Sequence, residues 1–217
     1  MLNAEKLMRL AENQDFSEII RLCREEIISA EAKKSGGASF EKSRKAFARY
    51  LKAQKNDPKL SVRYYSLQNI PNYGICQCVN NAYSAICVFG EKFSGEFIEK
   101  IPNNVTPLNF TQLFPNDFLS YPICIEIFQK DINAAYKFTC LDDRKRRIVK
   151  FDKGAYFDLN IVKPVFDVLG DCKVYMCEDF TKIAIIVSEI GIGLICPIKV
   201  KETVIPGIKN LSEILSK

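Results

Sequence analysis

The sequence contains no histidine and no tryptophan. Without an imidazole, the chain cannot build a Ser-His or Cys-His catalytic pair, a histidine metal triad or a histidine acid/base at neutral pH. Chemistry by carboxylate, lysine or tyrosine side chains remains open. The missing histidine therefore favours a binding protein over a catalyst, and we expect a chain that is not an enzyme and uses no cofactor.

Long hydrophobic runs are also missing. No segment approaches the roughly 18 uninterrupted apolar residues of a membrane helix, and the start, MLNAEKLMRLAENQ, lacks the basic-then-apolar layout of a signal peptide. Most of the nine cysteines sit inside apolar runs such as AICVF and GLICPI, which is typical of buried free thiols. We therefore expect a cytoplasmic protein, with no membrane partner.

The first part of the chain has the periodicity of helices. Apolar residues recur with a period near 3.6 between Leu7 and Ile27, and Ser35-Gly36-Gly37 interrupts this pattern. Ser39 is a candidate N-cap for a second helix, which Asn56-Asp57-Pro58 ends. The sequence thus predicts a helical hairpin over residues 1–58.

From about residue 60, short runs rich in Val, Ile, Tyr, Phe and Cys alternate with turn residues. The predicted strands are 61–68, 73–79, 83–89, 123–128, 147–152, 172–178, 182–189 and 192–200. Helices are predicted over about 130–138 and 160–168, and a short helix within 101–121. Because strands follow one another without helices between them, the pattern favours an antiparallel α+β domain over residues 59–217 rather than a doubly wound parallel sheet.

The positive charge is concentrated in one segment. The formal net charge is +5, yet lysines and arginines far outnumber acidic residues between Lys33 and Arg63, so the rest of the chain is net negative. Such asymmetry suggests an anionic partner. Helical spacing would place several of these cations on one face, where they could neutralise phosphates with little base readout, and Tyr50 is a candidate for stacking. The alternative is a solvated helix face.

A second basic run, RKRR, follows two aspartates in a predicted turn before a strand. Four consecutive cations are difficult to bury, so they either contact phosphates or form a polar hairpin tip. The candidate nucleic-acid contacts from both segments are Lys42, Arg44, Lys45, Arg49, Lys52, Lys55, Arg144, Lys145, Arg146 and Arg147.

Pairs of cysteines and of carboxylates are candidate metal ligands. The Cys76-x-Cys78 spacing places two thiols on one side of a strand, and Cys172 with Cys177 would be the second pair of a zinc site. Core thiols are the favoured alternative. The acidic pairs, which have the character of turn residues, are Asp142/Asp143 and Glu178/Asp179. We predict no metal.

The segment Arg147–Val200 contains a helix pattern at Tyr156–Leu169, strand patterns at Lys173–Cys177 and Ile183–Ser188, and the ending Cys196-Pro197-Ile198-Lys199. This order resembles the last module of bacterial DNA sliding clamps, in which a strand and a helix precede a series of strands and a Met-Pro-x-Arg-like tail. The resemblance implies a clamp-like α+β fold and a DNA-related context.

An upstream stretch, CQCVNNAYSAICVFGE, is similar to a clamp strand–turn–strand, with Asn81-Ala82-Tyr83 at the turn. The chain departs from the family because it has room for one such domain instead of three, replaces Met-Pro by Cys196-Pro197, and continues beyond Val200. The helical hairpin has no counterpart there. Clamps bind short peptides near these strands, so the resemblance implies a protein-binding surface, with strand core as the alternative. Its residues would be Val174, Ile195, Pro197 and Ile198.

These observations predict a non-enzymatic binding protein that acts on DNA or on a DNA-processing complex through basic surfaces. With its basic helix EKSRKAFARYLKAQ, the chain resembles small proteins of phages and prophages of low-GC bacteria. This resemblance implies that the expected cytoplasm is that of a bacterial host cell. One alternative is a protein-directed inhibitor of a host nuclease or defence system, as anti-CRISPR proteins are. A second is a metal-dependent hydrolase that uses carboxylates. The expected partner is DNA or a DNA-handling protein, and self-association stays open.

Overall fold

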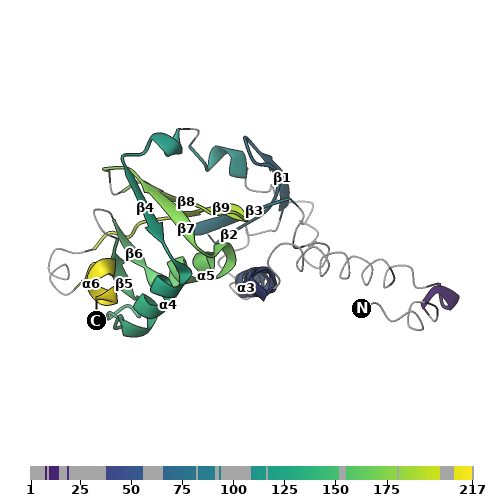
Figure 1. Ribbon diagram of the computed structural model, residues 1–217, viewed down its shortest axis with the longest axis horizontal. Helices are drawn as coiled ribbons and strands as arrows, with labels where there is room; N and C mark the ends of the chain where they lie inside the picture. Colours follow the sequence, from purple (N-terminus) through teal and green to yellow (C-terminus); the bar gives the residue numbers. More distant parts are fainter. Residues whose placement is uncertain are drawn as a thin grey trace.

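The computed structural model describes residues 8, 10–14, 19, 38–55, 66–81, 83–90, 93, 109–115, 117–151, 155–179, 181–200 and 208–216. Helices lie on one face of a seven-stranded antiparallel sheet (Figure 1), which confirms the predicted α+β class. Within these ranges no helix is both long and apolar enough to cross a bilayer. The first arm of the predicted hairpin falls largely outside the described residues.

The sheet joins two groups of consecutive strands, in the order β1-β2-β3-β9-β8-β7-β4. Strand β3 pairs antiparallel with β9, and this pairing connects the early group to the late one. The strands are β1 Ser66–Ile70, β2 Gly74–Asn80, β3 Ser84–Phe89, β4 Ile123–Ile127, β7 Cys172–Met176, β8 Ala184–Val187 and β9 Gly191–Ile195.

The described helices are α3 Ala38–Lys55, α4 Gln129–Phe138, α5 Leu159–Leu169 and α6 Leu211–Leu215, with short 3-10 turns at Phe110–Gln112 and Phe118–Ser120. The second arm of the predicted hairpin is thus α3, and the two later predicted helices correspond to α4 and α5. Two small elements were not predicted. One is α6, and the other is strand β6 (Tyr156–Asp158), which pairs with β5 (Ile148–Lys150).

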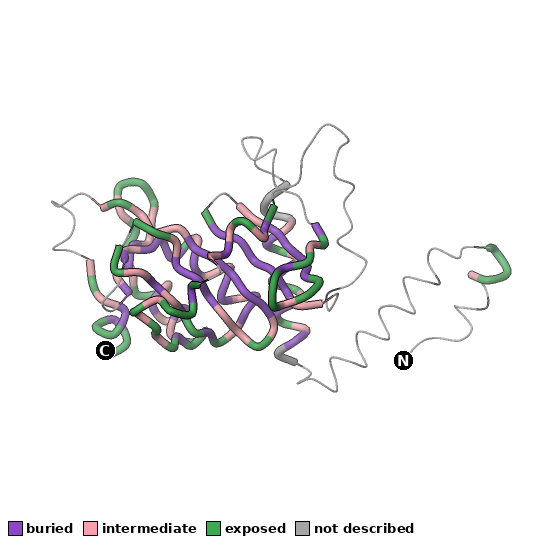
Figure 2. The backbone as a smooth tube through the Cα atoms, turned by 90° about the horizontal axis from the view of Figure 1, so that it is seen from above, coloured by how far each residue is buried: buried purple, intermediate pink, exposed green. Residues whose placement is uncertain are grey.

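Side chains alternate between the two faces of the sheet, as the period of two along a strand requires. In β3, Ile86 and Val88 face the helices, whereas Ala85 and Cys87 face the segment that carries Phe110. Figure 2 shows the resulting buried strands between more exposed surroundings. The sheet therefore separates a large helix-side core from a smaller core on its other face.

Helix α3 belongs to the helix-side core. Phe47 is fully buried, Phe40 and Tyr50 are nearly so, and the Phe47 ring lies 5.3 Å from that of Phe93. The helix also packs against α5. The predicted boundary at residue 58 thus divides residues that share one hydrophobic core.

Two glycines of β9 let α5 approach the sheet closely. A Cβ atom at Gly191 would lie 2.5 Å from the backbone oxygen of Cys87 and 2.9 Å from Leu169 Cδ2. At Gly193, a Cβ would lie 3.0 Å from Leu169 Cδ1 and 3.2 Å from Val165 Cγ1. Larger residues at these two positions would move α5 away from β9. The two glycines therefore set how closely the helices that carry the candidate sites pack on the sheet.

Candidate functional site

The solvent side of α3 is basic. Lys42, Lys45 and Arg49 are exposed along it, and their spacing of three and four residues places them on one side of the helix. Lys52 and Lys55 belong to the same helix, but their side chains lie outside the described part of the structure. For the side chains that the structure describes, α3 therefore has the predicted strip of exposed cations.

Two other residues of α3, Arg44 and Tyr50, are held by contacts within the protein, although the sequence predicted contacts with a partner for them. Arg44 is engaged by Glu41, with Nη2 2.8 Å from Oε1 and Nε 3.0 Å from Oε2. This hydrogen-bonded pairing holds the pKa of Glu41 below its usual value. Tyr50 is buried, and its hydroxyl lies 2.9 Å from Ser84 Oγ, so the prediction that it stacks on a base is wrong.

The second basic run forms a turn organised by Asp142. One oxygen of this carboxylate accepts backbone N–H groups from Arg144 at 3.0 Å and Arg146 at 2.7 Å. The other oxygen lies 2.7 Å from the Arg146 guanidinium. The backbone hydrogen bond from Arg146 is the main reason that the pKa of Asp142 is lowered. Asp142 is thus a structural acceptor, and Arg146 is its counterion.

Arg147 also has a structural position. Its guanidinium carbon lies 4.8 Å from the centre of the Tyr136 ring, and Nη1 donates to the carbonyl oxygen of Thr139. Its Nε atom is buried without a partner. Of the four predicted cations, Arg144 and Lys145 are exposed, so these two carry the outward charge of the turn.

The two basic segments lie on the helical side of the sheet, at opposite ends of α4 (Figure 1). Lys42 Nζ donates to Oε1 of Gln129, the first residue of α4, at 2.7 Å. The turn follows α4, whose ten residues give it a length of about 15 Å. We call the exposed cations of α3, α4 and the turn the basic helical surface: Lys42, Lys45, Arg49, Lys130, Lys137, Arg144 and Lys145.

Several carboxylates on this side are already engaged. Asp167 lies 2.5 Å from Lys163 Nζ, and Asp171 accepts the backbone N–H of Gln129 at 2.8 Å. With the Glu41 and Asp142 pairs, these contacts leave Asp131 and Asp143 as the remaining acidic side chains of α4 and the turn. The basic helical surface therefore keeps an excess of positive charge.

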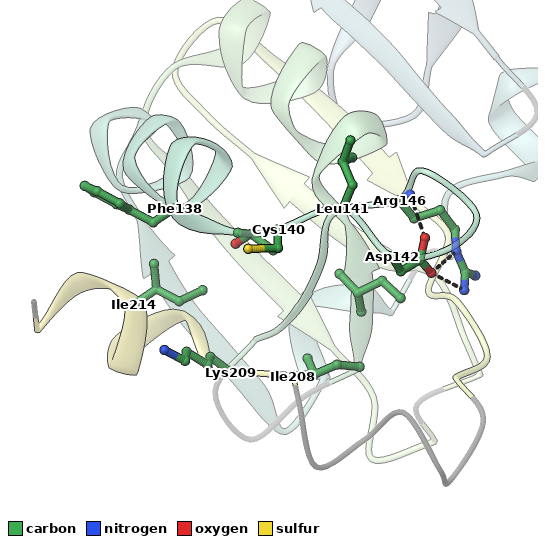
Figure 3. Close-up of a pocket in the computed structure, with 10 residues that line it drawn as sticks. Phe138, Cys140, Leu141, Asp142, Arg146, Ile208, Lys209 and Ile214 are labelled. Atoms are coloured by element: carbon green, nitrogen blue, oxygen red, sulfur yellow. Dashed lines mark hydrogen bonds and ion pairs between the residues drawn. The ribbon is translucent and has the colours of Figure 1, made fainter.

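A pocket of about 290 Å³ opens next to the turn, between the end of α4, strand β5 and the segment that enters α6 (Figure 3). Its walls are mainly apolar, and two large apolar side chains at its mouth, Phe138 and Leu141, are 73% and 52% exposed. The lining residues are Phe138, Thr139, Cys140, Leu141, Asp142, Arg146, Ile148, Ile208, Lys209 and Ile214.

Main-chain contacts hold the far wall of the pocket in place. The backbone N–H of Lys150 in β5 donates to the carbonyl oxygen of Lys209 at 3.2 Å. Asn210 and Glu213 form a capping box that starts α6 and positions Ile214. Figure 3 shows Phe138 and Ile214 toward one end of the pocket and the Asp142–Arg146 pair at the other.

Two of the four residues for which the clamp resemblance implied a protein-binding surface are not at the surface. Val174 and Ile195 are fully buried in the helix-side core, because each points from its strand toward the helices. They are therefore not surface residues, which corrects their assignment to a protein-binding site. Pro197 and Ile198 are partly exposed.

The cysteines considered for zinc do not converge. Cys76 and Cys78 are buried on one face of the sheet, whereas Cys172 is buried on the helical face. Asp179 accepts the backbone N–H and the hydroxyl of Thr181, as a turn residue does. Among the described residues no group of three or more cysteine, aspartate or glutamate side chains is arranged to hold a metal ion.

Sequence reasoning missed the pocket altogether. Its walls come from residues 138–148 and 208–214, which no local pattern connects. The one available signal was the Asn210-x-x-Glu213 spacing of a capping box, which marks the start of α6. No protein-family model matches the chain, and no curated protein matches it.

Proposed function

We propose that this protein is a non-enzymatic nucleic-acid-binding protein that contacts phosphates through its basic helical surface. The observation that carries the proposal is the set of exposed Lys42, Lys45 and Arg49 on one side of α3, with more exposed cations on α4 and its following turn. Lysine and arginine side chains arranged in this way neutralise phosphates and release counterions.

Contact with the phosphate backbone of the nucleic acid is favoured over recognition of its bases. The aromatic residue of α3 that was a candidate for stacking is buried, and the exposed side of the helix is formed by long cationic side chains. Phosphate contacts position a protein on nucleic acid but carry little sequence information. Binding that is independent of sequence and strongly dependent on salt follows from this surface.

The test measures affinity for a dye-labelled random-sequence duplex and its single strand across a salt series. We expect log K to fall linearly with log salt, and Lys45→Gln/Arg49→Gln to reduce the magnitude of this slope on the duplex by about 2, since each phosphate contact contributes about 0.9. Both side chains are exposed, so the variant is expected to fold.

The matched control removes the same charge elsewhere. Lys173 and Lys182 are exposed, Lys173 makes only a loose 3.9 Å ion pair with Glu126, and neither belongs to the basic helical surface. Lys173→Gln/Lys182→Gln should therefore keep the parent slope. Equal slopes in the two variants, or no binding at the lowest salt concentration, would contradict the proposal.

A further inference from the structure

We propose that the pocket between α4, β5 and α6 is a docking site for a short peptide segment of a partner protein. The segment would insert one bulky apolar side chain and place acidic side chains on the rim. This site is apart from α3 but adjoins the end of the basic helical surface that carries Lys137 and Lys145. It adds a protein partner to the proposed nucleic-acid partner.

The apolar part of the argument rests on side chains that face solvent instead of the core. Phe138 is 73% exposed and Leu141 is 52% exposed, yet both line the same pocket as the buried Ile148 and Ile214. Grouped apolar exposure of this kind marks interaction sites, whereas scattered single residues need no explanation. A segment that inserts one apolar side chain and lies across the Phe138 ring would remove both from water.

The size of the pocket limits the occupant. Sites for small molecules and cofactors usually range from about 300 to 1,000 Å³, so a pocket of about 290 Å³ lies at the lower end of that range. It suits a single anchoring side chain of a longer segment better than a large cofactor. The exposed Phe138 ring then offers contact area outside the pocket itself.

The positive charge on the rim of the pocket favours acidic residues on either side of the inserted side chain of the peptide. Lys209 lines the pocket and is exposed, Lys137 is exposed immediately before Phe138, and Lys145 is exposed in the adjoining turn. The acidic lining residue, Asp142, is already neutralised by Arg146 at 2.7 Å. The rim is therefore cationic toward a partner, and acidic side chains complement it.

The walls are pre-ordered, which lowers the entropic cost of binding. Thr139 closes α4 by donating its backbone N–H to Ala135 O at 2.9 Å, and Asp142 fixes the turn through two backbone N–H groups. The opposite wall is tied to β5 at Lys209. A peptide would thus meet a formed pocket.

The experiment selects random dodecapeptides displayed on phage against the full chain, followed by anisotropy titrations with the synthetic peptides obtained. We expect enriched peptides to share a bulky apolar residue flanked by Asp or Glu. Phe138→Ala/Leu141→Ala should weaken their binding by about tenfold or more, as loss of anchor contacts does. Lys209→Gln should weaken acidic peptides more than their amidated Asn/Gln versions.

Leu119→Ala is the matched control, because Leu119 is 64% exposed but lies away from the pocket, in a 3-10 turn on the other side of the sheet. It should bind the peptides as the parent does. The proposal would be overturned if the parent enriched no peptides beyond those that the Phe138→Ala/Leu141→Ala variant enriches. It would also be overturned if that variant and the parent bound the peptides equally, or if the enriched peptides lacked acidic residues. Concentration-dependent dimerisation that Phe138→Ala abolishes would assign the pocket to a second copy instead.

Discussion

Burial determines the chemistry of the cysteine side chains. Cys76, Cys78 and Cys87 lie together in the smaller core, where the neighbouring strands β2 and β3 place Cys78 opposite Cys87. Burial raises the pKa of the Cys76 thiol to about 11, with a smaller effect of Cys78, and raises the pKa of Cys87 well above its usual value. The thiols of Cys76 and Cys87 are therefore neutral and unreactive at physiological pH.

The raised pKa of Cys76 predicts a loss of stability in alkali. An unfolded cysteine releases its proton near pH 9, whereas folded Cys76 keeps it until about pH 11, so the folded state binds more protons between these values. The free energy of unfolding should fall across this window, as measured by urea unfolding under reducing conditions. Cys76→Ala should make the fall shallower, and Cys140→Ala, at an exposed position, should not. Equal slopes in all three proteins would be inconsistent with this assignment.

At the scale of elements, the packing of α5 on β9 depends on the absence of side chains in the strand. Gly191 pairs with Val88 and Gly193 pairs with Ile86, so both glycines lie where β9 meets β3 beneath the helix. The obstacle at Gly191 is a backbone oxygen, which cannot rotate away. At Gly193 the nearest atoms are Leu169 Cδ1 at 3.0 Å and the backbone oxygen of Ala85 at 3.1 Å, so both contacts are looser than the 2.5 Å contact at Gly191.

Substitution of the two glycines should therefore have unequal effects. Gly191→Ala should destabilise the protein by about 1–3 kcal/mol or more, as overpacking does, because the β3–β9 pair must separate. Gly193→Ala should cost less, because contacts of 3.0 and 3.1 Å need a smaller shift than the 2.5 Å contact at Gly191. Urea unfolding of both variants measures the difference. A greater loss for Gly193→Ala would show that the leucine contact is the rigid one.

How far the sequence predicts an element depends on its length and periodicity. The apolar run of β3 and the 3.6-residue pattern of α4 and α5 mark these elements because each extends over enough residues to be recognised. Strand β6 has three residues and leads directly into α5, so the sequence pattern assigned it to the helix. Burial of Tyr50 and the pocket beside Phe138 depend on contacts between distant segments, which no single stretch of sequence contains.

At the scale of the whole molecule, α3 joins the basic helical surface to the fold itself. Its exposed side carries Lys45 and Arg49, while Phe47 on the opposite side is part of the helix-side core. The cations are thus held on a packed helix rather than on a separate arm. The proposed phosphate binding and the folding of the chain therefore depend on the same element.

This arrangement predicts that Phe47→Ala destabilises the entire sheet, by about 3–5 kcal/mol, through loss of a fully buried aromatic side chain. Lys45→Ala, on the exposed side of the same helix, should change stability by no more than about 0.5 kcal/mol. Urea unfolding followed by circular dichroism tests both. If the strands of Phe47→Ala unfolded at the parent's midpoint, α3 would not be part of the cooperative unit.

The pairing of β3 with β9 also has a consequence for synthesis of the chain. Residues 84–89 leave the ribosome long before residues 191–195, yet each strand completes its main-chain hydrogen bonds only against the other. Contacts so distant in sequence form slowly, because a long loop must close first. During translation the edge of β3 that later pairs with β9 is unpaired. A nascent chain that stalls before β9 is made would therefore expose an apolar strand edge to other chains.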